Sequence, residues 1–120
     1  MNHKDLDVWK KSIELVTEIY SVTSTFPNEE KFGIVSQIRR AAVSVPSNIA
    51  EGCARFSDKE SLHFLNIAAG SLAELETQLI IANNLEFIKN KEILQKIYNI
   101  GQMLSGLKRH LKQKETNSQY

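Results

Sequence analysis

Residues that build turns and cross-links are scarce in this sequence of 120 residues. It holds five glycines and two prolines, too few for the many tight reversals of a β-sandwich or barrel, which favours long helices. Cys53 is the only cysteine, so an intrachain disulfide and a thiolate cluster for zinc are excluded. No apolar run approaches the ~18 residues of a membrane span, and the first residues lack the apolar stretch of a secretory signal. We therefore expect a cytoplasmic protein that does not engage a membrane.

The composition predicts one globular domain over residues 1–120. Hydrophobic residues make up 42% of the chain and charged residues 24%, a balance typical of a folded domain. The formal net charge of +1 hides an asymmetry, because residues 1–88 hold 8 basic and 12 acidic side chains whereas residues 89–114 hold 7 basic and one acidic. The C-terminal segment is therefore a candidate basic surface.

Apolar residues recur every three or four positions in four segments, about residues 6–25, 29–56, 58–85 and 91–112. The second segment keeps its apolar and polar stripes in phase through Pro46, which predicts one helix kinked at Pro46 and not two helices. In the fourth segment the apolar steps of 4, 3, 4, 3, 4 are those of a bundle seam. We predict an all-α fold, an antiparallel up-down four-helix bundle, followed by a polar tail at residues 115–120.

Polar residues of the second and third helical segments fall on one side of each helix. If these sides face each other or a neighbouring subunit, arginines of the second segment can meet carboxylates and set the register of the contact. A solvated face and a ligand site are the alternatives. The candidate polar network consists of Gln37, Arg40, Asn48, Glu51, Arg55 and Glu74.

Catalytic and metal-binding patterns are sparse. The spacing Glu60-x-x-His63 is used by di-iron bundles, but such a site needs a second copy of the motif, which the sequence lacks. Cys53 falls on the apolar stripe, as a small core residue would. No glycine-rich phosphate loop is present. We predict a protein that is not an enzyme and has no cofactor.

Basic side chains gather towards the C-terminus, with pairs elsewhere. Neutralising several phosphates would give salt-dependent affinity for RNA or DNA without base readout. The alternative is that these side chains only keep the helix face solvated. The candidate nucleic-acid-binding residues are Lys10, Lys11, Arg39, Lys108, Arg109 and Lys112.

Four blocks of sequence carry a resemblance to a known family. They are Asp5-Leu6-x-Val8-Trp9, Phe26-Pro27-x-Glu29-Glu30 with Gly33, the long run from Ser36 to Gly52, and Gly70-Ser71-Leu72-x-Glu74-Leu75-Glu76-Thr77-Gln78-Leu79. Over about residues 5–88 the chain resembles the 23S rRNA intervening-sequence proteins, a family of small bacterial four-helix bundles. One departure is Glu86-Phe87, where the family pattern has glycine followed by an aromatic residue.

The resemblance implies an antiparallel four-helix bundle that assembles as a ring-shaped homopentamer. It also implies kinship with the accessory protein of diversity-generating retroelements, which binds a reverse transcriptase and nucleic acid. In a ring, one modest basic patch would become a continuous band. We therefore expect a non-enzymatic homo-oligomeric scaffold or adaptor that engages a protein partner, nucleic acid or both. The alternatives are a purely structural oligomer and a small metal–carboxylate enzyme centred on Glu60 and His63.

Overall fold

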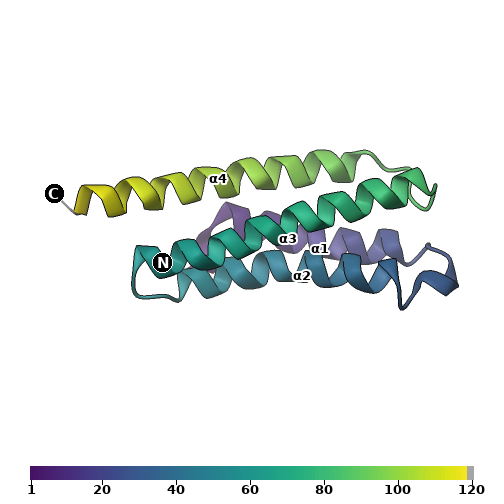
Figure 1. Ribbon diagram of the computed structural model, residues 1–120, viewed down its shortest axis with the longest axis horizontal. Coiled ribbons are helices and arrows are strands. Elements are labelled where there is room, and N and C mark those ends of the chain that lie inside the picture. Colours follow the sequence, from purple (N-terminus) through teal and green to yellow (C-terminus); the bar gives the residue numbers. More distant parts are fainter. Residues whose placement is uncertain (119–120) are drawn as a thin grey trace.

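The computed structural model is an elongated all-α bundle measuring 55 by 21 by 21 Å. It describes the backbone of residues 1–118 and the side chains of residues 1–114. Four long helices follow one another along the chain: α1 (Asp7–Thr23), α2 (Ile34–Cys53), α3 (Asp58–Asn84) and α4 (Glu92–Ser118). They alternate in direction and lie side by side, so the predicted antiparallel up-down four-helix bundle is confirmed (Figure 1).

The core is a continuous layer of aliphatic side chains contributed by all four helices. The steps of three and four residues seen in the sequence place one stripe of each helix inside the bundle. Helices α2 and α3 make the most extensive contact, and α1 and α4 make the sparsest contact of the adjacent pairs. The largest aliphatic side chains that are fully buried are Ile19, Ile38, Val45, Ile49, Leu65, Leu75, Leu79, Ile93, Ile97 and Leu104.

Helix α2 runs unbroken through Pro46, which confirms the prediction of one helix. Proline cannot donate a hydrogen bond to the carbonyl one turn earlier, at Ala42, so packing must offset that loss. Both residues are buried, and the helix is held on both sides of the proline by fully buried Val45 and Ile49. The bend expected at Pro46 stays a prediction.

Two helix ends differ from the positions expected from periodicity. Residues Asn28–Glu30 form a short 3-10 helix (η2), and α2 begins at Ile34 and not near Glu29. Polar residues 28–30 have no apolar stripe to bury, so they belong to the connection. At the other end of the chain, α4 continues to Ser118, into the segment predicted to be a polar tail. The last two residues of that tail lie outside the described residues.

The end of α3 is a helix stop that normally requires glycine. Glu86 has a φ of 64°, in the left-handed region, and its amide donates to the Asn83 carbonyl while the Phe87 amide donates to Ala82. This pair of bonds defines a Schellman motif, in which the left-handed residue is usually glycine because a Cβ atom is unfavourable there. The departure from the family pattern at this position therefore carries backbone strain.

Replacing Glu86 by glycine should raise the free energy of unfolding by about 1 kcal/mol, because glycine adopts positive φ without a steric penalty. Chemical denaturation followed by circular dichroism measures the change. Glu86→Ala is the control, since it removes the carboxylate but keeps the Cβ atom. A glycine variant no more stable than the alanine variant would show that the strain is absent.

Candidate functional site

The C-terminal half of α4 carries a stripe of basic side chains. Arg109, Lys112 and Lys114 are exposed and Lys108 is half-buried, whereas Leu104 and Leu111 on the same helix point into the core. Helical spacing puts residues three and four apart on one face, so residues 108, 109 and 112 are neighbours. Between Ile93 and Lys114 the helix contains no acidic residue. We call Lys108, Arg109 and Lys112 the basic stripe; Lys114 lies on another side of the helix, beside Leu107 and Leu111.

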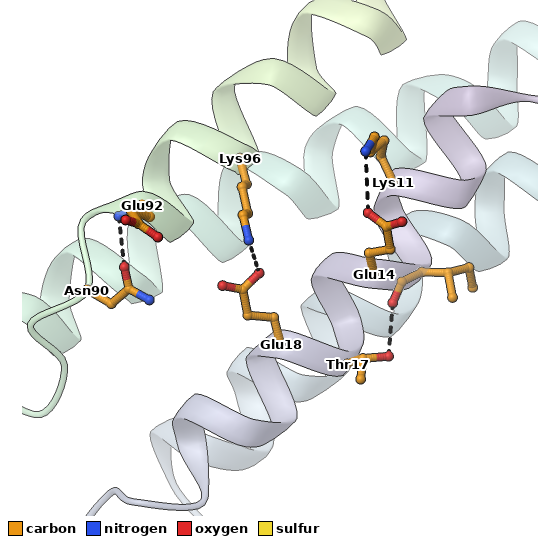
Figure 2. Close-up of polar contacts among 8 residues, drawn as sticks. Lys11, Glu14, Thr17, Glu18, Asn90, Glu92 and Lys96 are labelled. Atoms are coloured by element: carbon orange, nitrogen blue, oxygen red, sulfur yellow. Dashed lines mark hydrogen bonds and ion pairs between the residues drawn. The ribbon is translucent and has the colours of Figure 1, made fainter.

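Lys10 and Lys11 lie on the first half of α1, at the same end of the bundle as the basic stripe. Both are exposed. The ammonium group of Lys11 pairs with the carboxylate of Glu14 on the same helix at 3.5 Å, which offsets part of its charge (Figure 2). Lys10 makes no ion pair among the described side chains, so it adds more to the positive potential at this end.

Arg39 is separated from the other candidate cations and holds two helices together. Its Nε donates to Thr23 Oγ1 at 2.9 Å, its Nη2 donates to the Tyr20 carbonyl at 3.2 Å, and the guanidinium stacks over the Tyr20 ring. Tyr20 lies nine residues beyond Lys11, about 13 Å along α1 at 1.5 Å per residue. The structure thus brings the α1 and α4 candidates to one end and leaves Arg39 towards the other, as a link between α1 and α2.

The seam between α1 and α4 holds a polar bridge that sequence reasoning missed. Lys96 Nζ donates to Glu18 Oε2 at 2.7 Å (Figure 2), and this bond raises the pKa of Lys96 above its ordinary value. Beside it lies a cleft of about 440 Å³ whose floor includes Leu15, Ile100 and Met103. The two bridging residues are 78 positions apart, so only a correct pairing of the helices could have predicted the bond.

A small polar cluster lies at the α2–α3 contact, and Asn48 is the member of the predicted network that takes part in it. Ser44 and Ser71 share a hydrogen bond of 2.7 Å between their hydroxyl oxygens. The amide of Asn48 donates to the Ser44 carbonyl and to its hydroxyl oxygen, each at 2.9 Å. At one end of the same contact the Ser61 hydroxyl donates to the Gly52 carbonyl at 2.7 Å. Small side chains and short polar bonds thus set the register of this helix pair.

Three charged members of the predicted network, Glu51, Arg55 and Glu74, take partners four residues away in the sequence. Arg55 pairs with Glu51 one turn earlier and stacks over the Phe64 ring at 4.7 Å. Glu74 Oε1 accepts a hydrogen bond from Gln78 Nε2 at 3.1 Å. Gln37 and Arg40 are exposed and make no side-chain hydrogen bond or ion pair among the described residues. Within one subunit, Arg40 and Glu74 therefore do not form the pair that the spacing allowed.

Catalytic chemistry finds little support among the described residues. Glu60 and His63 are both exposed near the start of α3, and no group of three or more His, Cys, Asp or Glu side chains there is arranged to hold a metal ion. Burial raises the pKa of the Cys53 thiol, partly opposed by the charge of the N-terminal amine. The thiol is therefore protonated at neutral pH and a weak nucleophile.

None of the described helices is both long and apolar enough to cross a bilayer.

The sequence pattern of the 23S rRNA-intervening sequence proteins matches residues 4–106. The chain belongs to this family. The resemblance inferred from the motifs is thereby confirmed, and it extends into α4 as far as Gly106. Lys108, Arg109 and Lys112 lie beyond the matched residues, so the basic stripe is a property of this chain that the family match does not explain.

One solved structure gives the same arrangement of helices. It is a protein of unknown function from the S23 ribosomal protein family of Bacteroides thetaiotaomicron VPI-5482, with a TM-score of 0.78 and 28% sequence identity. The similarity covers 84% of this chain and 97% of that chain. A search of curated proteins found no match. The 23S rRNA-intervening sequence family and this relative thus support the fold and the kinship.

Proposed function

We propose that the chain is a non-enzymatic cytoplasmic scaffold that assembles with copies of itself and engages nucleic acid through the basic stripe of α4. The observation that carries the proposal is the run from Ile93 to Lys114, which holds five basic side chains and no acidic one. Of the five, Lys96 is engaged by Glu18, and the other four lie towards the end of the helix, three of them in the basic stripe. A protein partner such as a reverse transcriptase, as the family resemblance implies, would then meet the nucleic acid on this scaffold.

The chemistry of the stripe favours phosphate contacts over base recognition. Lysine and arginine neutralise phosphates and release counterions, and this binding weakens steeply with salt. No aromatic residue stands between Lys108 and Lys114, so stacking on unpaired bases has no platform there. A single subunit with a net charge of +1 binds a polyanion weakly. Repetition of the stripe in an oligomer would multiply the number of phosphates engaged at once.

Reversing the charge of Arg109 and Lys112 tests this function. We expect the Arg109→Glu/Lys112→Glu variant to bind RNA and DNA at least about tenfold more weakly, with a shallower dependence on salt, because two phosphate contacts are lost. Fluorescence anisotropy with labelled single-stranded and duplex oligonucleotides, at salt concentrations from about 50 to about 200 mM, measures both quantities.

The control changes the net charge equally but at the other end of the bundle. Lys89 and Lys91 are exposed and precede α4, so Lys89→Glu/Lys91→Glu should retain most of the affinity. Two outcomes reject a nucleic-acid surface on α4. One is wild-type protein with no salt-sensitive binding, which leaves a purely structural oligomer. The other is an equal loss of affinity in both variants, which indicates attraction by net charge alone.

A further inference from the structure

Helix α1 carries two apolar seams, one buried in the bundle core and one at the edge of the core that is only partly covered. Val8, Leu15 and Ile19 form the core seam and are buried. The second seam steps by 3, 4, 3 and 4 residues and consists of Leu6, Trp9, Ile13, Val16 and Tyr20. On this second seam Ile13 is 40% exposed and Tyr20 is 43% exposed. A spacing of three and four residues is how one helix packs against another, so the second seam is shaped for a helix outside the core.

The second seam and α2 border a groove on the surface of the bundle. One section, of about 340 Å³, is lined by residues that include Trp9, Ile13, Pro46 and Ala50. The next section, of about 450 Å³, includes Tyr20 and Phe32, and Val43 borders both sections. From residue 32 to residue 50 the groove extends about 27 Å at the helical rise. That length is too great for one small ligand and fits a helix of about five turns.

The charges around this α1–α2 groove are of one sign. Lys31, Arg39 and Arg40 line one section, and no carboxylate lines either section. Arg39 is engaged by Tyr20 and Thr23, whereas Arg40 is exposed and makes no ion pair with the described side chains. The occupant that complements the groove is therefore a helix with apolar side chains flanked by carboxylates.

The chain itself contains a helix with these properties. Helix α3 exposes Ile67 and Ile81, which are 40% and 45% accessible, and between them it exposes Glu74. These three residues are seven positions apart, which places them along one side of the helix. We call Ile67, Glu74 and Ile81 the outer face of α3. Across the whole helix four acidic residues stand against one lysine. Helix α4 is basic and α1 already borders the groove, so α3 is the best match in charge and length.

We propose that the α1–α2 groove receives the outer face of α3 from a second copy of this chain, with Arg40 of one copy facing Glu74 of the next. The proposal rests on the self-association proposed above and names the surfaces that produce it. Because the groove and the outer face are different patches, the contact is head-to-tail, and successive copies close into a ring or continue as a chain.

A charge placed in the groove tests the surface. Val43→Asp puts a carboxylate on an exposed position between the two sections, and we expect assembly to be lost in sedimentation velocity and light scattering. Phe56→Asp is the matched control, because Phe56 is fully exposed in the turn between α2 and α3 and lines neither section of the groove. Circular dichroism verifies that both variants stay folded.

A charge reversal tests the occupant. Arg40→Glu and Glu74→Arg should each raise the dissociation constant at least about tenfold, and the variant with both changes should recover most of the loss, as an interfacial ion pair does. Losses that add in the double variant would exclude α3 as the occupant. If Val43→Asp assembles like wild type, the groove is not the interface although self-association stands. If wild-type protein sediments as a monomer at every concentration, both the interface and the proposed self-association fail.

Discussion

Replacing Leu75 by alanine should lower the free energy of unfolding by about 3 kcal/mol. Leu75 lies near the middle of α3 and is fully buried among aliphatic side chains from the other helices. Removing three carbon atoms there forfeits their transfer from water and leaves a cavity that the rigid helices can only partly close. Urea unfolding followed by circular dichroism measures the loss as a lower midpoint with little change in slope.

Leu85→Ala is the matched control for this prediction. The side chain removed is the same, but Leu85 is 54% exposed at the end of α3. Its replacement should cost well under half as much, because little buried area is lost. Equal losses at the two positions would contradict the core described for α3.

Introducing valine at Gly52 should lower the free energy of unfolding by about 2 kcal/mol, because the α3 backbone leaves no room for a larger side chain there. A Cβ atom at Gly52 would lie 3.1 Å from the Ser61 carbonyl oxygen and 3.4 Å from the Phe64 Cβ atom. Valine adds two further methyl groups to this contact. The helices must move apart, which also strains the bond from the Ser61 hydroxyl to the Gly52 carbonyl.

The control for Gly52 is a glycine with space around it. A Cβ atom at Gly106 in α4 would meet nothing within 4 Å, so Gly106→Ala should raise stability by about 1 kcal/mol through helix propensity alone. Thermal unfolding of the two variants should therefore shift in opposite directions. A stabilised valine variant at position 52 would show that the α2–α3 contact is looser than the structure indicates.

Periodicity predicted the helices well because each has a stripe to bury. The steps of four and three from Ile93 to Leu111 correspond to a buried seam in α4, and Ser57 caps α3 by accepting the Glu60 amide at 3.2 Å. The same reasoning placed the start of α2 too early. Residues 29–33 carry no stripe, and only the fold shows that they turn the chain before Ile34.

The candidate sites were harder to predict because their geometry depends on which helices pair. The recurrence of apolar residues predicted α1, but the sequence could not divide those residues into a core seam and a partly exposed seam. Arg39 was a candidate nucleic-acid-binding residue, whereas its guanidinium stacks on the Tyr20 ring of the neighbouring helix. Lys108, Arg109 and Lys112 lie within five residues of one another in the sequence, so their clustering needed no tertiary information.

The helix pairs of the bundle contact each other to different extents, and this difference sets the order in which the helices separate. Helices α2 and α3 are joined along their length by small residues, buried aliphatic side chains and the Ser44–Ser71 bond. Helices α1 and α4 touch sparsely, and Lys96–Glu18 is the ion pair that spans them among the described residues. Fluctuations short of global unfolding should therefore begin by parting α4 from α1, while the central hairpin persists as the last cooperative unit. A bound nucleic acid that pulls on the end of α4 would therefore strain the sparse contact between α1 and α4 before the other helix contacts.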